Sequence, residues 1–218
     1  MPDTLTYLKN KFGLDYSQKL PLVLKIERFK GLCGLFHELG YRIGAEIGVS
    51  NGRYSKWLIQ KNRGLKLYCI DPWTAYDEYV ERHGEGAQVL QDASYEATKK
   101  RLAPFDCHII KKTSMDALKD FKDESLDFVF IDGNHTFQYV VNDIAEWSKK
   151  VRKGGIISGH DYWNSVDLEV GKEWVYIKSR DEKRRLCQVK DVVDAWVKTN
   201  EINPWFVTED KVWLWVKQ

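Results

Sequence analysis

The sequence has almost no excess of charge of either sign, because 34 lysine and arginine residues stand against 32 aspartate and glutamate residues. A domain that binds nucleic acid needs a basic surface, which a net charge of +2 does not predict. No apolar run approaches the roughly 20 residues of a membrane helix, and residues 1–13 lack the basic start and apolar middle of a secretion signal. We therefore expect a cytoplasmic protein whose partners include neither a membrane nor a nucleic acid.

Cysteine is scarce and scattered. Cys33, Cys69, Cys107 and Cys187 stand far apart and form no CxxC pair, which disfavours a zinc knuckle and a thiol redox motif. Cys69 and Cys107 lie in short apolar runs, where a free thiol in a reducing compartment usually behaves as a small buried hydrophobe. We expect these cysteines to be structural.

Short apolar strands alternate with segments of helical periodicity through the middle of the chain. The predicted strands are 43–47, 67–70, 107–110, 126–131 and 155–158, and the predicted helices between them are 51–60, 87–102, 114–121 and 137–151. Each crossover between parallel strands is right-handed and needs a helix to span it. The alternation therefore predicts an α/β fold, a doubly wound and mostly parallel sheet with helices on both faces.

The two ends of the chain depart from this alternation. Leu22–Leu39 has the three-and-four spacing of an amphipathic helix stopped by Gly40, so residues 1–40 are predicted to be a helical extension of a domain over residues 41–218. After the fifth strand, residues 162–185 are polar and aromatic without a clear period, which predicts an irregular insert before a helix at 189–199.

The chain closes with two β-rich runs around a polar turn. Trp205–Thr208 and Val212–Val216 flank Glu209, Asp210 and Lys211, and this pattern predicts an antiparallel hairpin.

The turn after the first strand is rich in glycine. Gly48 and Gly52 stand four residues apart between Glu46 and the helix, and glycine lets the backbone turn tightly and approach a ligand closely. A tight turn without a ligand is the alternative. The dinucleotide fingerprint GxGxxG would need glycine where this chain has Glu46 or Ser50, so a nicotinamide-linked dehydrogenase is the weaker interpretation.

The end of the second strand carries an acid. Asp71 stands where an acidic residue receives a ribose diol beside the first strand in this topology. Trp73 follows shortly after it, and its ring can either lie on an adenine face or cap the core.

This constellation resembles the class I S-adenosylmethionine-dependent methyltransferases, whose first motif is acid-x-glycine-x-x-x-glycine followed by an acid at the second strand end. The resemblance covers roughly residues 40–218 and implies a Rossmann-like sheet of seven strands that ends in an antiparallel hairpin. It also implies S-adenosylmethionine as the cofactor. The residues implied to bind it are Glu46, Gly48, Ser50, Gly52, Asp71, Trp73, Asp132 and Ser114, the last in the adenine-contacting position after the third strand.

Two later segments look like a subgroup that includes small-molecule and sugar O-methyltransferases. They are the run from Phe128 to His135 and the run from Gly155 to Tyr162. Because both end adjacent parallel strands, Asp132, His160 and Asp161 are expected to converge at the carboxyl edge of the sheet. Two carboxylates and an imidazole can hold a divalent cation. An imidazole in the set favours manganese, iron or zinc over magnesium, which prefers an all-oxygen shell.

His135 stands three residues after Asp132, where catechol-type relatives carry a lysine base. Imidazole titrates near neutral pH, so the resemblance implies that His135 and Asp132 are catalytic, with His135 as general base for an acceptor hydroxyl that then attacks the sulfonium methyl group in line. As alternatives, His135 caps the helix that starts near Thr136, or His160 and Asp161 form a hydrogen-bonded loop pair.

The acceptor is expected to be a small molecule or a sugar hydroxyl, framed by the insert over residues 162–185 and by Tyr76 and Tyr79 on the opposite wall. A catalytically silent nucleoside-binding domain is the competing function of a different class. Nucleic-acid methylation is disfavoured by the balanced charge and by the lack of an Asn/Asp-Pro-Pro-Tyr loop. The sequence leaves a homo-oligomer open.

Overall fold

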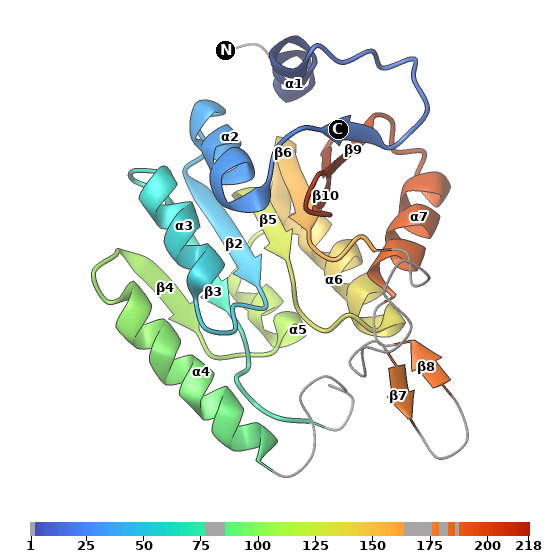
Figure 1. The fold of residues 1–218 in the computed structure, drawn as a ribbon. Helices are drawn as coiled ribbons and strands as arrows, with labels where there is room; N and C mark the ends of the chain where they lie inside the picture. Colours follow the sequence, from blue (N-terminus) through green and yellow to red (C-terminus); the bar gives the residue numbers. More distant parts are fainter. Residues whose placement is uncertain (1–2, 77–85, 164–175, 179–182, 186–187) are drawn as a thin grey trace.

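Residues 3–76, 86–163, 176–178, 183–185 and 188–218 are described by the structure, a computed structural model. They form one sheet of eight strands with helices on both faces (Figure 1). In order across the sheet, the strands are β1 (Leu22–Leu24), β9 (Trp205–Thr208), β10 (Trp213–Val216), β6 (Val151–Gly159), β5 (Leu126–Ile131), β2 (Ile43–Ile47), β3 (Lys66–Ile70) and β4 (Cys107–Ile110). Among these described strands only β10 runs antiparallel to its neighbours, so the others share one carboxyl edge.

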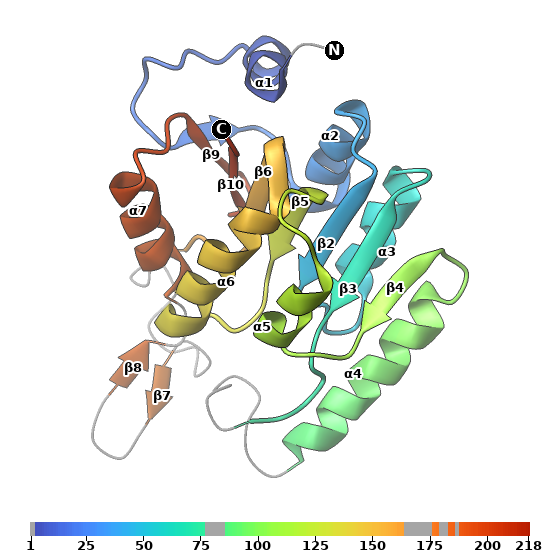
Figure 2. The same ribbon diagram turned by 180° about the vertical axis from the view of Figure 1, so that it is seen from behind.

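Three helices cover each face of the sheet. Figure 1 shows α2 (Cys33–Glu38), α3 (Arg53–Lys61) and α4 (Ala87–Leu102) in front of it. Figure 2 shows α5 (Ser114–Ala117), α6 (Phe137–Lys150) and α7 (Val189–Thr199) on the opposite face. The π-helix η1 (Arg28–Leu32) runs into α2, the 3-10 helix η3 (Leu118–Asp120) continues α5, and α1 (Thr4–Phe12) lies beyond the amino ends of the strands (Figure 1).

Two apolar cores lie on either side of the sheet, because side chains alternate along each strand. On β5, Phe128 and Phe130 point into the core under α2 and α3, which also contains Leu58. Val129 and Ile131 point into the core under α6 and α7. The continuous apolar run of β5 is therefore buried on both faces, as expected for a central parallel strand. The predicted fold class and the C-terminal hairpin are confirmed.

The prediction of one helix over Leu22–Leu39 is wrong at its start. Leu22–Leu24 forms β1, which pairs in parallel with β9 and adds an eighth strand to the expected seven. Leu22 and Leu24 are buried whereas Val23 is 61% exposed, the alternation of a strand with one buried face. The helical part begins only at Arg28. As a result, the chain leaves β1 at the carboxyl edge of the sheet and brings Arg28 to that edge.

Other differences from the predicted elements are smaller. The fifth predicted strand extends backwards to Val151, with a bulge in its pairing to β5. Within the predicted irregular insert, β7 (Tyr176–Lys178) and β8 (Lys183–Arg185) form an antiparallel pair. The remainder of that insert and the predicted wall residue Tyr79 lie outside the described residues.

The three cysteines that the structure describes are free thiols. Cys33 and Cys69 are buried in the core beneath α2 and α3, and Cys107 is half-buried beside them. These positions agree with the expected structural role, and Cys187 lies outside the described residues. Among the described helices, none has both the length and the apolar character needed to cross a bilayer.

Gly44 on β2 allows the aromatic core to close against the sheet. A Cβ atom at Gly44 would lie 2.2 Å from Cζ of Phe128, and Phe128 is itself stacked on Phe36 with ring centroids 4.1 Å apart. We predict that Gly44→Ala lowers the free energy of unfolding by about 1–3 kcal/mol, because the buried Phe128 ring has no room to move. Urea denaturation measures this change.

Gly34→Ala is the matched control. Gly34 lies in α2 and a Cβ atom there meets nothing within 4 Å, so alanine should stabilise the helix by up to about 1 kcal/mol. Equal unfolding midpoints for Gly44→Ala and the unmodified protein would contradict the packing argument.

Candidate functional site

A cleft of about 240 Å³ opens at the carboxyl ends of β2, β3 and β5. Loops at this edge come from distant parts of the sequence, because all the parallel strands end here. The residues that line the cleft are Arg28, Phe29, Glu46, Gly48, Val49, Ser50, Asn51, Arg53, Tyr54, Asp71, Asp132 and His135. Of the predicted site residues, the structure thus brings Glu46, Gly48, Ser50, Asp71, Asp132 and His135 to one cleft.

The two glycines of the turn after β2 are needed for different contacts. Gly48 has a φ of 86°, and a Cβ atom there would lie 2.1 Å from the carbonyl oxygen of Asp132. Gly52 has a φ of 73°, and a Cβ atom there would lie 3.2 Å from Cγ2 of Thr98 in α4. Both φ values lie in the left-handed region that glycine tolerates. The glycine pattern therefore holds the turn close to β5 on one side and to α4 on the other.

The carboxylate of Asp71 is fixed by the turn that it faces. Its Oδ2 atom accepts a hydrogen bond from the backbone N–H of Ser50 at 2.9 Å, and its Oδ1 atom accepts one from the backbone N–H of Trp73 at 2.8 Å. These bonds connect the ends of β2 and β3 and set the orientation of the carboxylate at the cleft.

The sequence allowed the ring of Trp73 either to lie on an adenine face or to cap the core, and in the structure it caps the core. Its side chain is fully buried, its indole N–H donates to the carbonyl oxygen of Ser50 at 2.7 Å, and its ring packs on Tyr95 with centroids 4.8 Å apart. The ring therefore faces the protein interior and offers no face to an adenine. Its hydrogen bond holds the Ser50 turn in place.

Glu46 is the buried acid of the cleft. Its side chain is 2% exposed and accepts a short hydrogen bond from the hydroxyl of Ser55. Burial raises the pKa of Glu46 to about 8, because the hydrogen bond from Ser55 only partly offsets the loss of solvation, and the charge of Asp132 raises it further. At neutral pH this carboxyl group is mostly protonated.

An imidazole lies between two carboxylates beside the cleft. The Nε2 atom of His135 is 3.5 Å from Oδ1 of Asp132 and 3.2 Å from Oδ2 of Asp161. One potential ligand atom from each residue lies within 4.8 Å of the other two. Two carboxylate oxygens and an imidazole nitrogen at this spacing fit a borderline divalent cation such as manganese, iron or zinc better than magnesium.

The cation set expected from the sequence was Asp132, His160 and Asp161, whereas the potential ligand residues that lie together are Asp132, His135 and Asp161. The Nδ1 atom of His160 lies 3.0 Å from Oδ1 of Asp161, and its Nε2 atom lies 3.1 Å from the carbonyl oxygen of Asp210. Because both ring nitrogens have protein partners, His160 orients Asp161, and His135 occupies the third position. Asp161 has a φ of 61°, so the chain turns sharply between these adjacent side chains.

The charges around Asp161 reinforce this arrangement. Burial acts to raise the pKa of Asp161, but the hydrogen bond from His160 and the charges of both imidazoles lower it well below its usual range. Burial acts to lower the pKa of His160, and the hydrogen bond to Asp161 with the charges of Asp132 and Asp161 reverses that effect and raises it. Asp161 is therefore an ionised carboxylate at neutral pH.

Ser114, expected in the adenine-contacting position, has a hydroxyl that points into the protein. Its hydroxyl donates to the buried Asp143 and accepts a hydrogen bond of 2.8 Å from the indole N–H of Trp147. Burial raises the pKa of Asp143 to about 7, although the hydrogen bond from Ser114 lowers it. The hydroxyl of Ser114 thus belongs to an interior network under α6.

Arg28 is a cleft residue that the sequence interpretation missed. Its Nη1 atom lies 3.1 Å from Oδ2 of Asp132, and its guanidinium group lies over the rings of Phe29 and Tyr54, at 4.8 and 5.8 Å from their centroids. The sequence offered no clear signal for this position, because Leu22–Leu24 is apolar at all three residues and its strand conformation comes from pairing with β9.

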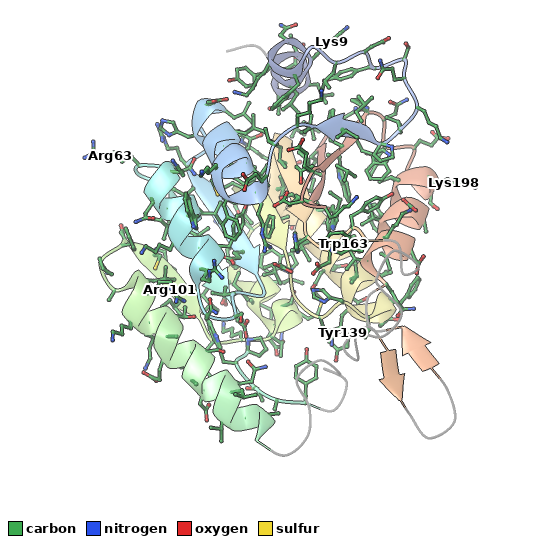
Figure 3. All side chains as sticks on the ribbon, in the orientation of Figure 1. Lys9, Arg63, Arg101, Tyr139, Trp163 and Lys198 are labelled. Carbon is green, nitrogen blue, oxygen red and sulfur yellow. The ribbon has the colours of Figure 1, made fainter. Side chains whose placement is uncertain are left out.

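Aromatic side chains stand at the rim of this edge. Asn134 donates to the hydroxyl of Tyr76 at 3.4 Å, and the ring of Tyr76 lies 6.0 Å from that of Tyr139. The indole N–H of Trp163 donates to Oδ1 of Asp161 at 3.2 Å. Figure 3 shows Tyr139 and Trp163 on the side of the molecule where β5 and β6 end.

Comparisons with known proteins show the family of this chain. A sequence model of a family described as a methyltransferase domain matches residues 45–162. An uncharacterized protein of Acanthamoeba polyphaga mimivirus is 37% identical over 126 residues, which are 54% of this chain and 50% of that protein. An uncharacterized protein of Sinorhizobium fredii is 24% identical over 119 residues, 55% of this chain and 12% of that protein. The chain thus spans half or less of the length of these curated relatives.

Solved structures share the fold at low sequence identity. A candidate caffeoyl-CoA O-methyltransferase from Staphylococcus aureus has a TM-score of 0.62 and 14% identity, covering 98% of this chain and 97% of that one. An O-methyltransferase from Bacillus cereus, solved in complex with S-adenosylhomocysteine (SAH), has a TM-score of 0.56 and 16% identity, covering 98% of this chain and 89% of that one. The family match spans the glycine turn, the acid after β3 and the cluster after β5 and β6, and by this match the chain belongs to the class I S-adenosylmethionine-dependent methyltransferases.

Proposed function

We propose that this protein transfers the methyl group of S-adenosylmethionine to a hydroxyl group of a small molecule or sugar. The observation that carries the proposal is the position of the Asp132, His135 and Asp161 cluster beside the cleft formed by the glycine turn and Asp71. The glycine turn and Asp71 suit a nucleoside, and the adjoining cluster suits proton transfer. The Bacillus cereus O-methyltransferase, which binds SAH, has the same fold.

In this proposal the cofactor lies across the glycine turn with its ribose on Asp71. The Asp71 carboxylate accepts hydrogen bonds from the ribose hydroxyls while the backbone of Ser50 and Trp73 holds it in place. Gly48 lets the turn pack against the main chain of Asp132, and Gly52 lets it pack against Thr98 of α4. The acids Glu46 and Asp132 face the cationic ammonium and sulfonium groups of the ligand.

His135 acts as the general base in this proposal. Its Nε2 atom takes the proton from the acceptor hydroxyl, and the carboxylates of Asp132 and Asp161 at 3.5 and 3.2 Å stabilise the imidazolium that forms. The hydroxyl oxygen then forms a bond to the methyl carbon as the carbon–sulfur bond breaks, and the electron pair of that bond remains on sulfur. Positioning provides most of the rate, because a sulfonium is already a good leaving group.

The same three residues would hold a divalent cation if the enzyme uses one. A cation there would lower the pKa of an acceptor hydroxyl and fix its oxygen near the methyl group. His135 then serves as a ligand through Nε2, so its two roles exclude each other. Turnover after removal of metal by a chelator distinguishes them, because a base needs no added cation.

The carboxylate of Asp71 is proposed to bind the ribose of the cofactor. Asp71→Asn should weaken binding of SAH by about 1–3 kcal/mol, because a charged hydrogen-bond acceptor becomes a neutral one. Isothermal titration calorimetry measures the affinity. Asp106→Asn, at the opposite end of the strands beside β4, is the control and should bind normally. Undiminished affinity in Asp71→Asn would remove Asp71 from the ribose site.

The second prediction concerns the base. His135→Gln should lower kcat by about 10²- to 10⁴-fold, the usual contribution of a general base, and leave the affinity for SAH within about twofold. His37→Gln, an exposed histidine on α2, is the matched control. Transfer of radioactive methyl groups to an acceptor measures turnover. Normal cofactor binding without transfer to any hydroxyl acceptor would favour the silent nucleoside-binding domain.

The third prediction concerns pH. Glu46 has a pKa of about 8 and is mostly protonated at pH 7 in the free protein. The ammonium group of a bound ligand favours the carboxylate and lowers that pKa, so binding should release a proton, and affinity should rise with pH until it levels off above about 8. Calorimetry at pH 7 in buffers of different ionisation enthalpy detects this release. Glu46→Gln should abolish it, and buffer-independent heats in the unmodified protein would disprove the idea.

A further inference from the structure

Arg28 is a partly buried cation in a cleft where acids predominate. The side chain of Arg28 is 21% exposed, whereas Arg53, the other arginine that lines the cleft, is an exposed residue. The acids on the same lining are Glu46, Asp71 and Asp132. Coulomb interactions strengthen as solvent is excluded, so Arg28 offers the stronger of the two positive sites for an anionic group.

The fold fixes the position of Arg28 from both ends of the chain. β1 delivers the residue to the carboxyl edge of the sheet, and the backbone N–H of Arg28 donates to Oδ2 of Asp210 at 2.9 Å. Asp210 lies in the turn between β9 and β10, where its Oδ1 atom accepts a hydrogen bond of 2.6 Å from Thr208. The main chain of Arg28 is therefore held in place before any ligand arrives.

The guanidinium group of Arg28 lines the cleft and packs on two aromatic rings. The rings of Phe29 and Tyr54 lie against its flat face, an arrangement that leaves the N–H groups at the edge available. Within the described residues it donates one side-chain hydrogen bond, from Nη1 to Asp132. Most of its five N–H donors thus stay available for a ligand, and the planar fork matches a carboxylate.

We propose that Arg28 binds the carboxylate of the amino-acid end of the cofactor. This inference rests on the proposed function, because it assumes an S-adenosyl ligand with its ribose on Asp71. That ligand carries two cationic groups, which suit Glu46 and Asp132, and a single anion, which needs a cation. The first turn of α3 lies beside Arg28 through Tyr54, and its N-cap residue Gly52 supplies no capping side chain, so backbone N–H groups there add to the attraction for an anion.

The test compares two nucleosides that differ only in the carboxylate. SAH and its analogue with hydrogen in place of the carboxylate, and with the amine kept, are titrated into the unmodified protein, Arg28→Gln and Arg28→Lys. The unmodified protein should prefer SAH by at least about tenfold, as expected for a charge-assisted pair. In Arg28→Gln the preference should fall to within about threefold, with little change in the affinity for the analogue.

Arg101→Gln is the charge-matched control. Arg101 lies on α4 (Figure 3) and contacts Asn51 at 3.2 Å without lining the cleft, so its loss should leave the tenfold preference intact. Arg28→Lys retains the charge but not the fork and should keep an intermediate preference. This variant provides the test if Arg28→Gln does not fold.

The outcomes separate this inference from the proposed function. Equal weakening of both nucleosides by Arg28→Gln would overturn the assignment, because it would show a structural role. Equal affinity of the unmodified protein for the two nucleosides would also overturn it while leaving the cofactor site in place. Failure of the unmodified protein to bind either nucleoside would overturn the proposed function itself.

Discussion

The close approach of Gly48 to the main chain of Asp132 is the contact on which the site depends. A side chain at position 48 would collide with the carbonyl of Asp132, 2.1 Å from the Cβ position, so the ends of β2 and β5 can meet only because that residue is glycine. This contact places the nucleoside part of the cleft directly beside Asp132 and His135. The distance between the proposed ribose acceptor and the proposed base is thus set by backbone packing, which is more rigid than any pair of flexible side chains.

A second constraint is the series of hydrogen bonds that connects the C-terminal hairpin to the carboxyl edge of the sheet. Asp210 holds the backbone of Arg28 with its carboxylate and the Nε2 atom of His160 with its carbonyl oxygen. His160 in turn holds Asp161. The hairpin contributes no residue to the lining of the cleft, yet it orients groups on both sides of Asp132. Its function in the fold is to support residues that lie far from it in the sequence.

The sequence predicted the central strands and the residues at their ends better than it predicted what each of those side chains contacts. Apolar runs such as Leu126–Ile131 identify central strands because they are buried on both faces. Strand ends then identify Asp71, Asp132 and Asp161, since parallel strands deliver residues to one edge. What a side chain does at that edge depends on its direction. Trp73, Ser114 and His160 all stand at predicted positions, and each has a hydrogen bond that turns its polar group toward protein atoms.

The short strand β1 near the amino-terminal end was not predictable for a different reason. Three residues with two leucines fit a helical pattern as well as an alternating one, so Leu22–Leu24 carries too little signal to decide. Its strand conformation comes from pairing with the edge of β9, which lies far from it in the sequence. Tertiary pairing of this kind overrides local preference, and the position of Arg28 follows from it.

The pairing of β1 with β9 has a consequence for biosynthesis. Leu22 is synthesised long before its partner Phe206. The nascent chain can therefore form the central strands before β1 can pair with β9. Until then, the side chains of Leu22 and Leu24 remain exposed to water. Such long-range pairing slows folding and leaves apolar surface open to chaperones or to wrong partners until β9 has been synthesised.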